Sequence, residues 1–209
     1  MKEIIKRAIV YFLICSVLVY ALFHILKMTN LAFEEFLPNI VTFIVQVFIL
    51  GFLFDWFDRY RKYRAKIDSF NTIKAILVEP IIRFNEPDKK DVYVNEDNLE
   101  HHLLLAEKNI GTVGINHYQE LLNSLDLQRH SSSGLMILAS QISNFHVWHV
   151  GNLIGTLARM LEEIGKICPT PGEFQEITNT KHFNWGFNQN FRTYLHNCSL
   201  FSQSKKNIK

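Results

Sequence analysis

Histidine is the residue type in this sequence best suited to metal chemistry. His146 and His149 in FHVWH are three positions apart and would share one helix face, and His101 and His102 form a second pair. A zinc site needs about three or four such ligands converging on one point. The sequence has no HExxH and no paired Cys/His spacing. Histidines beside Trp and Phe are more typical of packed core residues, so we predict no metal site.

Nucleophilic and phosphate-binding motifs give no stronger signal. Cys15, Cys168 and Cys198 show no CxxC spacing, and no GxSxG elbow occurs. The GTVG at 111–114 lacks the lysine of a P-loop. We therefore predict that the protein is not an enzyme, with no catalytic residue and no cofactor. The net charge of +2 is too small to predict direct nucleic-acid binding.

Two apolar stretches dominate the N-terminal part of the chain. Residues 8–26 carry no formal charge, and a second stretch covers about 38–57. Each is close to the ~20 residues with which a helix crosses ~30 Å of hydrocarbon. Two alternatives are a pair of buried helices in a soluble protein and a cleaved signal peptide. We predict instead a transmembrane hairpin over residues 1–57, because neither stretch has a polar helix face.

Lysine and arginine residues near the span ends predict the orientation. Three basic residues precede the first span and five follow the second, whereas the connecting segment has only Lys27, beside two glutamates. Both termini are therefore expected in the cytoplasm. Aromatic and basic side chains following the second span would contact the headgroups of the lipid bilayer. This predicted membrane-interface collar comprises Trp56, Arg59, Tyr60, Arg61, Lys62, Tyr63 and Arg64.

A few polar residues lie within the spans. Ser16 belongs to the first span, and Thr42 and Gln46 lie one turn apart in the second. Polar side chains of this kind can hydrogen-bond between membrane helices. They would pair within the hairpin or, alternatively, in a homo-oligomer around a polar lining.

Beyond the membrane, the second span is expected to continue as one helix to Glu79, since proline at position 80 disfavours helix in the preceding residue. The part of the chain that follows the second span, residues 58–84, is the predicted basic juxtamembrane stalk helix. Apolar residues recur there with spacings of four and three, except at Lys74. The seam would pack on later helices of the same chain or, alternatively, between protomers. Its candidate residues are Tyr63, Ile67, Phe70 and Leu77.

The remainder predicts a cytoplasmic helical domain at 85–201, after a polar loop at 85–98, and a flexible basic tail at 202–209. The long stretch that follows the serine cluster at 131–133 predicts a helix. From 131 to 158 it contains no charged residue. It is either the central helix of the domain or a segment that moves onto the membrane. The fold class is thus an all-α membrane protein.

This layout resembles the small two-span effector proteins of bacterial anti-phage systems, including the transmembrane effectors encoded beside some retrons. The resemblance is one of architecture: a basic N-terminus, the hairpin, the collar and a helical domain. It implies growth arrest or lysis on activation, and inhibition by a protein or ribonucleoprotein partner. The alternative is a membrane-anchored scaffold or sensor, in which the hairpin only locates the domain.

Overall fold

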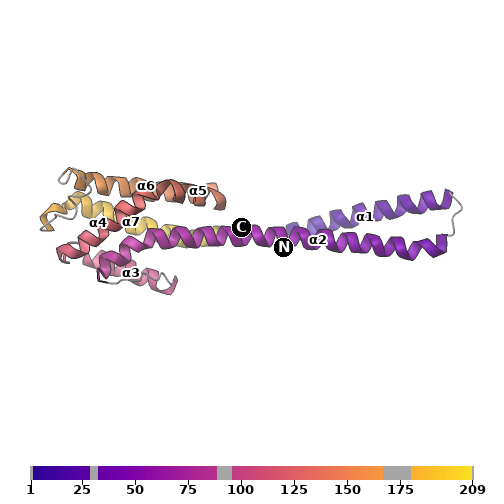
Figure 1. Ribbon diagram of the computed structural model, residues 1–209, viewed down its shortest axis with the longest axis horizontal. Coiled ribbons are helices and arrows are strands. Elements are labelled where there is room, and N and C mark those ends of the chain that lie inside the picture. Colours follow the sequence, from indigo (N-terminus) through magenta and orange to yellow (C-terminus); the bar gives the residue numbers. More distant parts are fainter. Residues whose placement is uncertain (1, 29–32, 89–95, 167–179, 209) are drawn as a thin grey trace. The chain divides into compact units, whose positions relative to one another are not determined.

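The computed structural model describes residues 2–28, 33–88, 96–166 and 180–208, and every regular element in these ranges is helical (Figure 1). This confirms the all-α class. Cys168 and residues 89–95 of the predicted polar loop lie outside these ranges. The elements are α1 (Lys2–Met28), α2 (Phe33–Asn85), α3 (Glu96–Asn109), α4 (Ile115–His130), α5 (Ser132–Ile142), α6 (Asn144–Gly165), the 3-10 turn η2 (Thr180–His182), α7 (Trp185–Gln203) and the 3-10 turn η3 (Ser204–Asn207).

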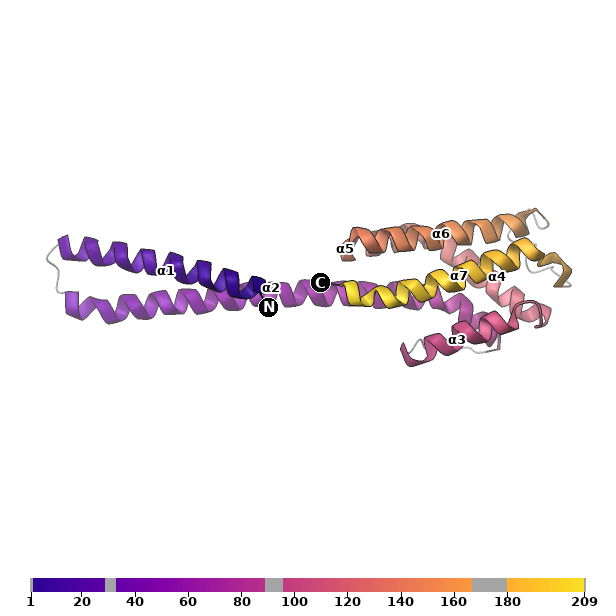
Figure 2. The ribbon, with the colours of Figure 1, turned by 180° about the vertical axis from the view of Figure 1, so that it is seen from behind.

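The chain divides into two compact units, Met1–Lys62 and Tyr63–Lys209. In the first unit, α1 runs antiparallel alongside the N-terminal part of α2 (Figures 1 and 2). Within the described residues, one helix, Val41–Asn85, is long and apolar enough to cross a membrane. The apolar helix Ile9–Ile25 is shorter than that criterion requires. The structure thus supports one candidate span, where the sequence predicted two.

The second unit has its own core, to which α2, α4, α5, α6 and α7 all contribute. Helix α7 packs along α6 and also contacts α3, while α6 contacts α4 and α5. Burial of large apolar and aromatic side chains is the main stabilising contribution to such a helical domain. Its largest fully buried members include Phe70, Leu77, Ile81, Phe84, Tyr118, Leu121, Phe187, Phe191, Tyr194 and Phe201.

The sequence predicted that helix α2 ends before Pro80, and this prediction was wrong. Pro80 is buried inside the helix, which continues to Asn85. A proline within a helix has no N–H for the carbonyl four residues earlier, here that of Ile76. The side-chain amide Nε2 of Gln128 on α4 lies 3.5 Å from this oxygen and donates to it. The neighbouring helix thus provides a donor where the proline has none.

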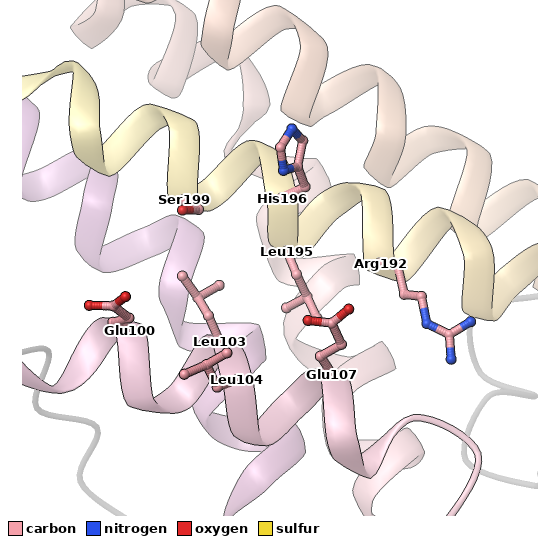
Figure 3. A pocket seen from close by; sticks show the side chains of 8 residues that line it. All are labelled: Glu100, Leu103, Leu104, Glu107, Arg192, Leu195, His196 and Ser199. Atoms are coloured by element: carbon pink, nitrogen blue, oxygen red, sulfur yellow. The ribbon is translucent and has the colours of Figure 1, made fainter.

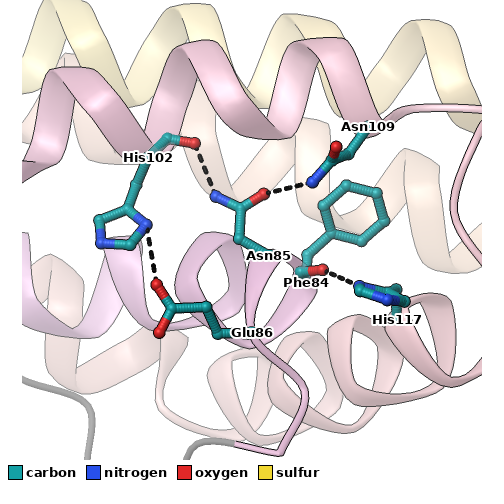
Figure 4. Close-up of polar contacts among 6 residues, drawn as sticks. All are labelled: Phe84, Asn85, Glu86, His102, Asn109 and His117. Carbon is teal, nitrogen blue, oxygen red and sulfur yellow. Dashed lines mark hydrogen bonds and ion pairs between the residues drawn. The ribbon is translucent and has the colours of Figure 1, made fainter.

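The C-terminal end of α2 is held by side chains from α3 and α4 (Figure 4). Asn85 donates from Nδ2 to the His102 carbonyl at 2.8 Å and accepts at Oδ1 from Asn109 at 3.3 Å. His117 Nδ1 lies 2.7 Å from the Phe84 carbonyl oxygen. The last carbonyls of a helix have no partner within it, so these contacts fix where α2 stops.

The charge-free stretch is not one helix but two. Ser143 has φ −174° and ψ 163°, an extended conformation that separates α5 from α6. Its hydroxyl lies 2.8 Å from Nδ1 of His146, one turn into α6. A serine side chain that bonds to a nearby group favours the start of a helix over a helix interior. The expectation of a continuous helix across 131–158 is therefore corrected.

Candidate functional site

The apolar segment of α2 is the most unusual surface in the described chain. None of its most apolar 18-residue window is buried, and Phe43 and Phe54 are 65% and 72% exposed. The core helix of a soluble protein would bury such residues against other elements. An apolar helix of this length, with none of its most apolar window buried, is suited to hydrocarbon.

The collar at the end of this segment contains ion pairs that the sequence reasoning did not include. Arg59 Nε lies 3.1 Å from Asp55, and Lys62 Nζ lies 2.6 Å from Asp58. Arg61 Nη2 lies 3.6 Å from the same Asp58 carboxylate. The separations of three and four residues were a sequence signal for these pairs. Two acidic residues therefore offset part of the positive charge of the collar.

The aromatic part of the collar is exposed. Trp56 and Tyr60 stack one turn apart, with ring centroids 5.8 Å apart and planes 16° from parallel. Tyr63 is 44% exposed, and Arg64 is exposed as well. Exposed indole and phenol rings next to an apolar segment match the amphipathic composition of a membrane–water interface.

The three polar residues predicted within the spans differ in their surroundings. The Thr42 hydroxyl donates to the Pro38 carbonyl of its own helix at 2.7 Å. Ser16 on α1 is exposed, and so is Gln46. Among the residues that the structure describes, the Gln46 amide has no hydrogen-bond partner. The structure does not bring these three side chains together.

The seam residues follow a gradient of burial along α2. Tyr63 is exposed, Ile67 is partly buried against the core, and Phe70 and Leu77 are 0% and 2% exposed. The Phe70 ring stacks on Phe201 of α7 with centroids 4.8 Å apart. Phe70 and Leu77 therefore pack against helices of the same chain.

A buried polar cluster joins this part of α2 to α4 and α7. The Tyr194 hydroxyl lies 2.7 Å from the Leu77 carbonyl oxygen and 2.9 Å from Oε1 of Gln128. The Cys198 thiol lies 3.8 Å from the same carbonyl. Burial raises the pKa of the Tyr194 hydroxyl and that of the Cys198 thiol well above their usual ranges. Both groups are neutral at physiological pH and act as hydrogen-bonding groups.

The histidine pair of α6 is part of the packing. His146 is fully buried, with its ring edge-on to Phe70 at 5.9 Å and to Phe201 at 6.1 Å. Burial lowers the pKa of His146 and of His149. In the described part of the chain, no three His, Cys, Asp or Glu side chains are close enough to hold a metal ion.

A polar groove of about 250 Å³ lies between α3 and α7 (Figure 3). Glu100 and Glu107 line it from α3, and Arg192 and His196 line it from α7. Leu103, Leu104 and Leu195 also line it, so polar and apolar side chains share the groove. Opposite charges on facing helices make this groove a surface for polar contacts.

The surface over α5 and the first half of α6 has exposed apolar side chains and no charged residue. Ile137 is 61% exposed, Phe145 is 46% exposed and Trp148 is 62% exposed. They lie within the charge-free stretch that the sequence singled out. A surface of exposed aromatic residues without charge is typical of contact with another molecule.

No protein-family model, curated protein or solved structure matches this chain.

Proposed function

We propose that the protein is a bacterial inner-membrane effector of an anti-phage system, which perturbs membrane integrity when an inhibitory partner releases it. In this proposal both apolar stretches cross the bilayer as a hairpin and both termini lie in the cytoplasm. The helical domain that follows holds the hairpin inactive while the partner is bound. The protein performs no catalysis itself.

The observation that carries the proposal is the uncovered apolar segment of α2. Most of its large side chains are exposed, and none in the most apolar window is buried. Transferring such a surface from water into hydrocarbon is favourable, in proportion to the apolar area. A function carried out in the bilayer places this apolar surface in contact with hydrocarbon instead of water.

A second observation supports control by the domain. Helix α2 belongs to both units, and its residues Phe70 to Asn85 are integrated in the core of the second. Tyr194 and Gln128 hold the carbonyls on the N-terminal side of Pro80. A change in the packing of the domain would thus act on the same continuous helix that enters the membrane.

Cysteine and histidine chemistry supports a role without catalysis. The Cys198 thiol is fully engaged in the core, and burial keeps it protonated. His146 is likewise enclosed by aromatic rings. Neither side chain offers a nucleophile or base to a substrate.

The test is controlled expression of the full chain in a bacterium with a membrane-potential dye and viable counts. We expect rapid depolarisation and loss of viability. Val45→Arg, which places a charge in the apolar segment at a cost of about 2.5–3.5 kcal/mol, should abolish both effects, whereas the matched Val45→Ile should retain them. Normal growth with the chain confirmed in the membrane, and no effect of a challenge with phage, would refute the effector proposal.

The membrane topology is tested separately by reporter fusions. An alkaline phosphatase joined after position 209 should stay inactive, and a cytoplasmic reporter joined there should be active. A fusion in the segment between the two apolar stretches should behave in the opposite way. Equal reporter activity at both places would refute the hairpin.

The alternative function is a membrane-anchored scaffold or sensor. It is favoured by the exposed apolar surface of Ile137, Phe145 and Trp148, which suits a protein partner. A scaffold would tolerate any apolar span, so exchange of residues 38–57 for an unrelated apolar helix would leave its function intact. An effector would lose its effect on the membrane.

A further inference from the structure

Gln46 is the only amide side chain between Ile40 and Phe54, and Asn39 is the other amide in the uncharged part of α2. Its neighbours Val45 and Val47 are about half exposed, and no charged residue occurs from Phe36 to Phe54. The Gln46 side chain is exposed, and no described group hydrogen-bonds to it. An amide moved into an apolar medium without a hydrogen-bond partner is strongly disfavoured. If α2 crosses a bilayer, this side chain needs a partner.

The position of Gln46 on the helix decides where that partner can be. The less exposed side of the segment carries Ile44 and Phe48. Gln46 is two residues from each, a rotation of roughly 200° in a helix of ~3.6 residues per turn. Helix α1 is the other helix described in this unit. The half-buried side of α2 is therefore taken as the side that contacts α1. Gln46 faces away from α1.

Gln46 also lies in a regular stripe. Thr42 precedes it by four positions, and Leu50 and Leu53 follow at four and seven. All of these side chains are exposed, Leu50 at 53% and Leu53 at 49%. Apolar residues with spacings of three and four, interrupted by one amide, form the pattern by which helices pair and fix their register. Thr42 does not compete as the polar contact, because its hydroxyl bonds to its own helix.

We propose that two copies of this chain pair in the membrane through this face of α2, with the Gln46 side chains hydrogen-bonded to each other. An amide is both donor and acceptor, so it is complementary to itself across a twofold axis. The face carries no charge, and identical copies therefore do not repel each other. The inference rests on the proposed function in one respect, which is that α2 lies in hydrocarbon.

The first experiment measures pairing of the full chain in native membranes. Two copies with different affinity tags are co-expressed, and membranes are extracted as polymer-bounded discs before isolation through one tag. Gln46→Leu should reduce the co-isolated fraction about tenfold, from the loss of two interhelical hydrogen bonds. Gln46→Asn retains the amide and should pair as the native chain does. Unchanged pairing of the Gln46→Leu chain would overturn the proposal.

Cysteine cross-linking then tests the face. In a chain with the native cysteines replaced by alanine, Leu50→Cys should form an oxidised dimer, and Phe48→Cys on the opposite side should not. Equal cross-linking at both positions would overturn the assigned face. Co-isolation of the cysteine-free parent shows whether the alanine replacements themselves weaken pairing. The co-isolation experiment on the native chain does not depend on that result.

Alkaline extraction distinguishes the two proposals. A chain that stays in the membrane fraction but does not pair refutes the self-association and leaves the effector proposal standing. A chain that alkaline carbonate washes from the membrane refutes both.

Discussion

The Tyr194 hydroxyl hydrogen-bonds to the backbone carbonyl of Leu77, 117 positions earlier in the chain, at 2.7 Å. The reason for this contact lies in Pro80. Its ring displaces the helix carbonyls that precede it and removes one donor. Ile76 receives a replacement from Gln128, and Leu77 receives an additional one from Tyr194. These contacts tie α2, α4 and α7 together beside Pro80, where α2 lacks a backbone donor.

Removing the Tyr194 hydroxyl should therefore destabilise the second unit. Tyr194→Phe leaves the Leu77 carbonyl and the Gln128 amide in the core with one contact fewer. We expect a loss of about 1–3 kcal/mol in the free energy of unfolding. Urea denaturation of the full chain in detergent, followed by circular dichroism, measures it.

Tyr63→Phe is the matched control, since that ring is 44% exposed. Its effect should stay within about 0.5 kcal/mol. Equal stabilities of the two variants would show that the Tyr194 hydroxyl makes no net contribution to the free energy of unfolding.

A second prediction concerns the stack of Phe70 on Phe201. Phe70→Ala removes a fully buried ring from the contact between α2 and α7. The lost burial and the cavity together should cost about 3–5 kcal/mol. Leu127→Ala, at a position 68% exposed, should cost at most about 0.5 kcal/mol. Thermal unfolding of both variants in the same detergent makes the comparison, and a similar shift in both would contradict the burial of Phe70.

Acidification should destabilise the domain through His146. Burial lowers its pKa in the folded state, a hydrogen bond with the Ser204 backbone offsets part of this shift, and His149 and Lys66 lower the pKa further. Below the pKa of about 6.5 of an exposed histidine, the unfolded chain binds a proton that the folded chain does not. Stability is therefore fully present above that pH and falls as the pH drops toward the folded pKa.

The measurement is the unfolding temperature of the full chain between pH 8 and pH 5. His146→Gln should flatten the decline, whereas the same change at the exposed His101 should leave it as it is. His149 contributes with the same sign, because burial lowers its pKa as well. A decline that is as steep in the His146→Gln, His149→Gln double variant as in the native chain would exclude these imidazoles as its cause.

Cys198 should resist alkylation until the domain unfolds. The thiol is 2% exposed and burial raises its pKa, so both access and thiolate are lacking. Peptide mass spectrometry after iodoacetamide treatment at pH 8 should find Cys198 unmodified in the native chain and modified in urea. A cysteine placed by Gln203→Cys, one turn later and exposed, provides the positive control. Rapid native labelling of Cys198 would mean that α7 separates from the core.

The stalk illustrates what sequence periodicity could and could not predict. Of the four seam residues that spacings of three and four selected, Phe70 and Leu77 lie in the core, Ile67 is partly buried and Tyr63 is exposed. The pattern left the partner open, because a self-packed helix and a protomer contact both need one apolar face. Lys74 broke the pattern but is itself only 6% exposed. A long aliphatic stem can be buried while its ammonium group finds a partner, so residue type alone misjudges such a position.

Local rules failed where a distant side chain intervened. The rule that proline ends a helix did not allow for Gln128 and Tyr194, which reach Ile76 and Leu77 from other helices. The break at Ser143 has a local cause instead, since the Ser143 side chain hydrogen-bonds to His146 three residues later. Nothing in the hydropathy of the stretch marks that bond. The residues of the polar cluster could not be assembled from spacing because their contacts join distant parts of the chain.

All three tryptophans of the chain lie at the surface, with Trp56 52% exposed, Trp148 62% and Trp185 79%. The intrinsic fluorescence of this protein will therefore report its surroundings more than its core. Emission from Trp56 reads the end of the apolar helix, that from Trp148 the uncharged face of α6, and that from Trp185 the start of α7. Single-tryptophan variants would thus give three separate optical probes, each turning blue only when lipid or another chain covers its own part of the molecule.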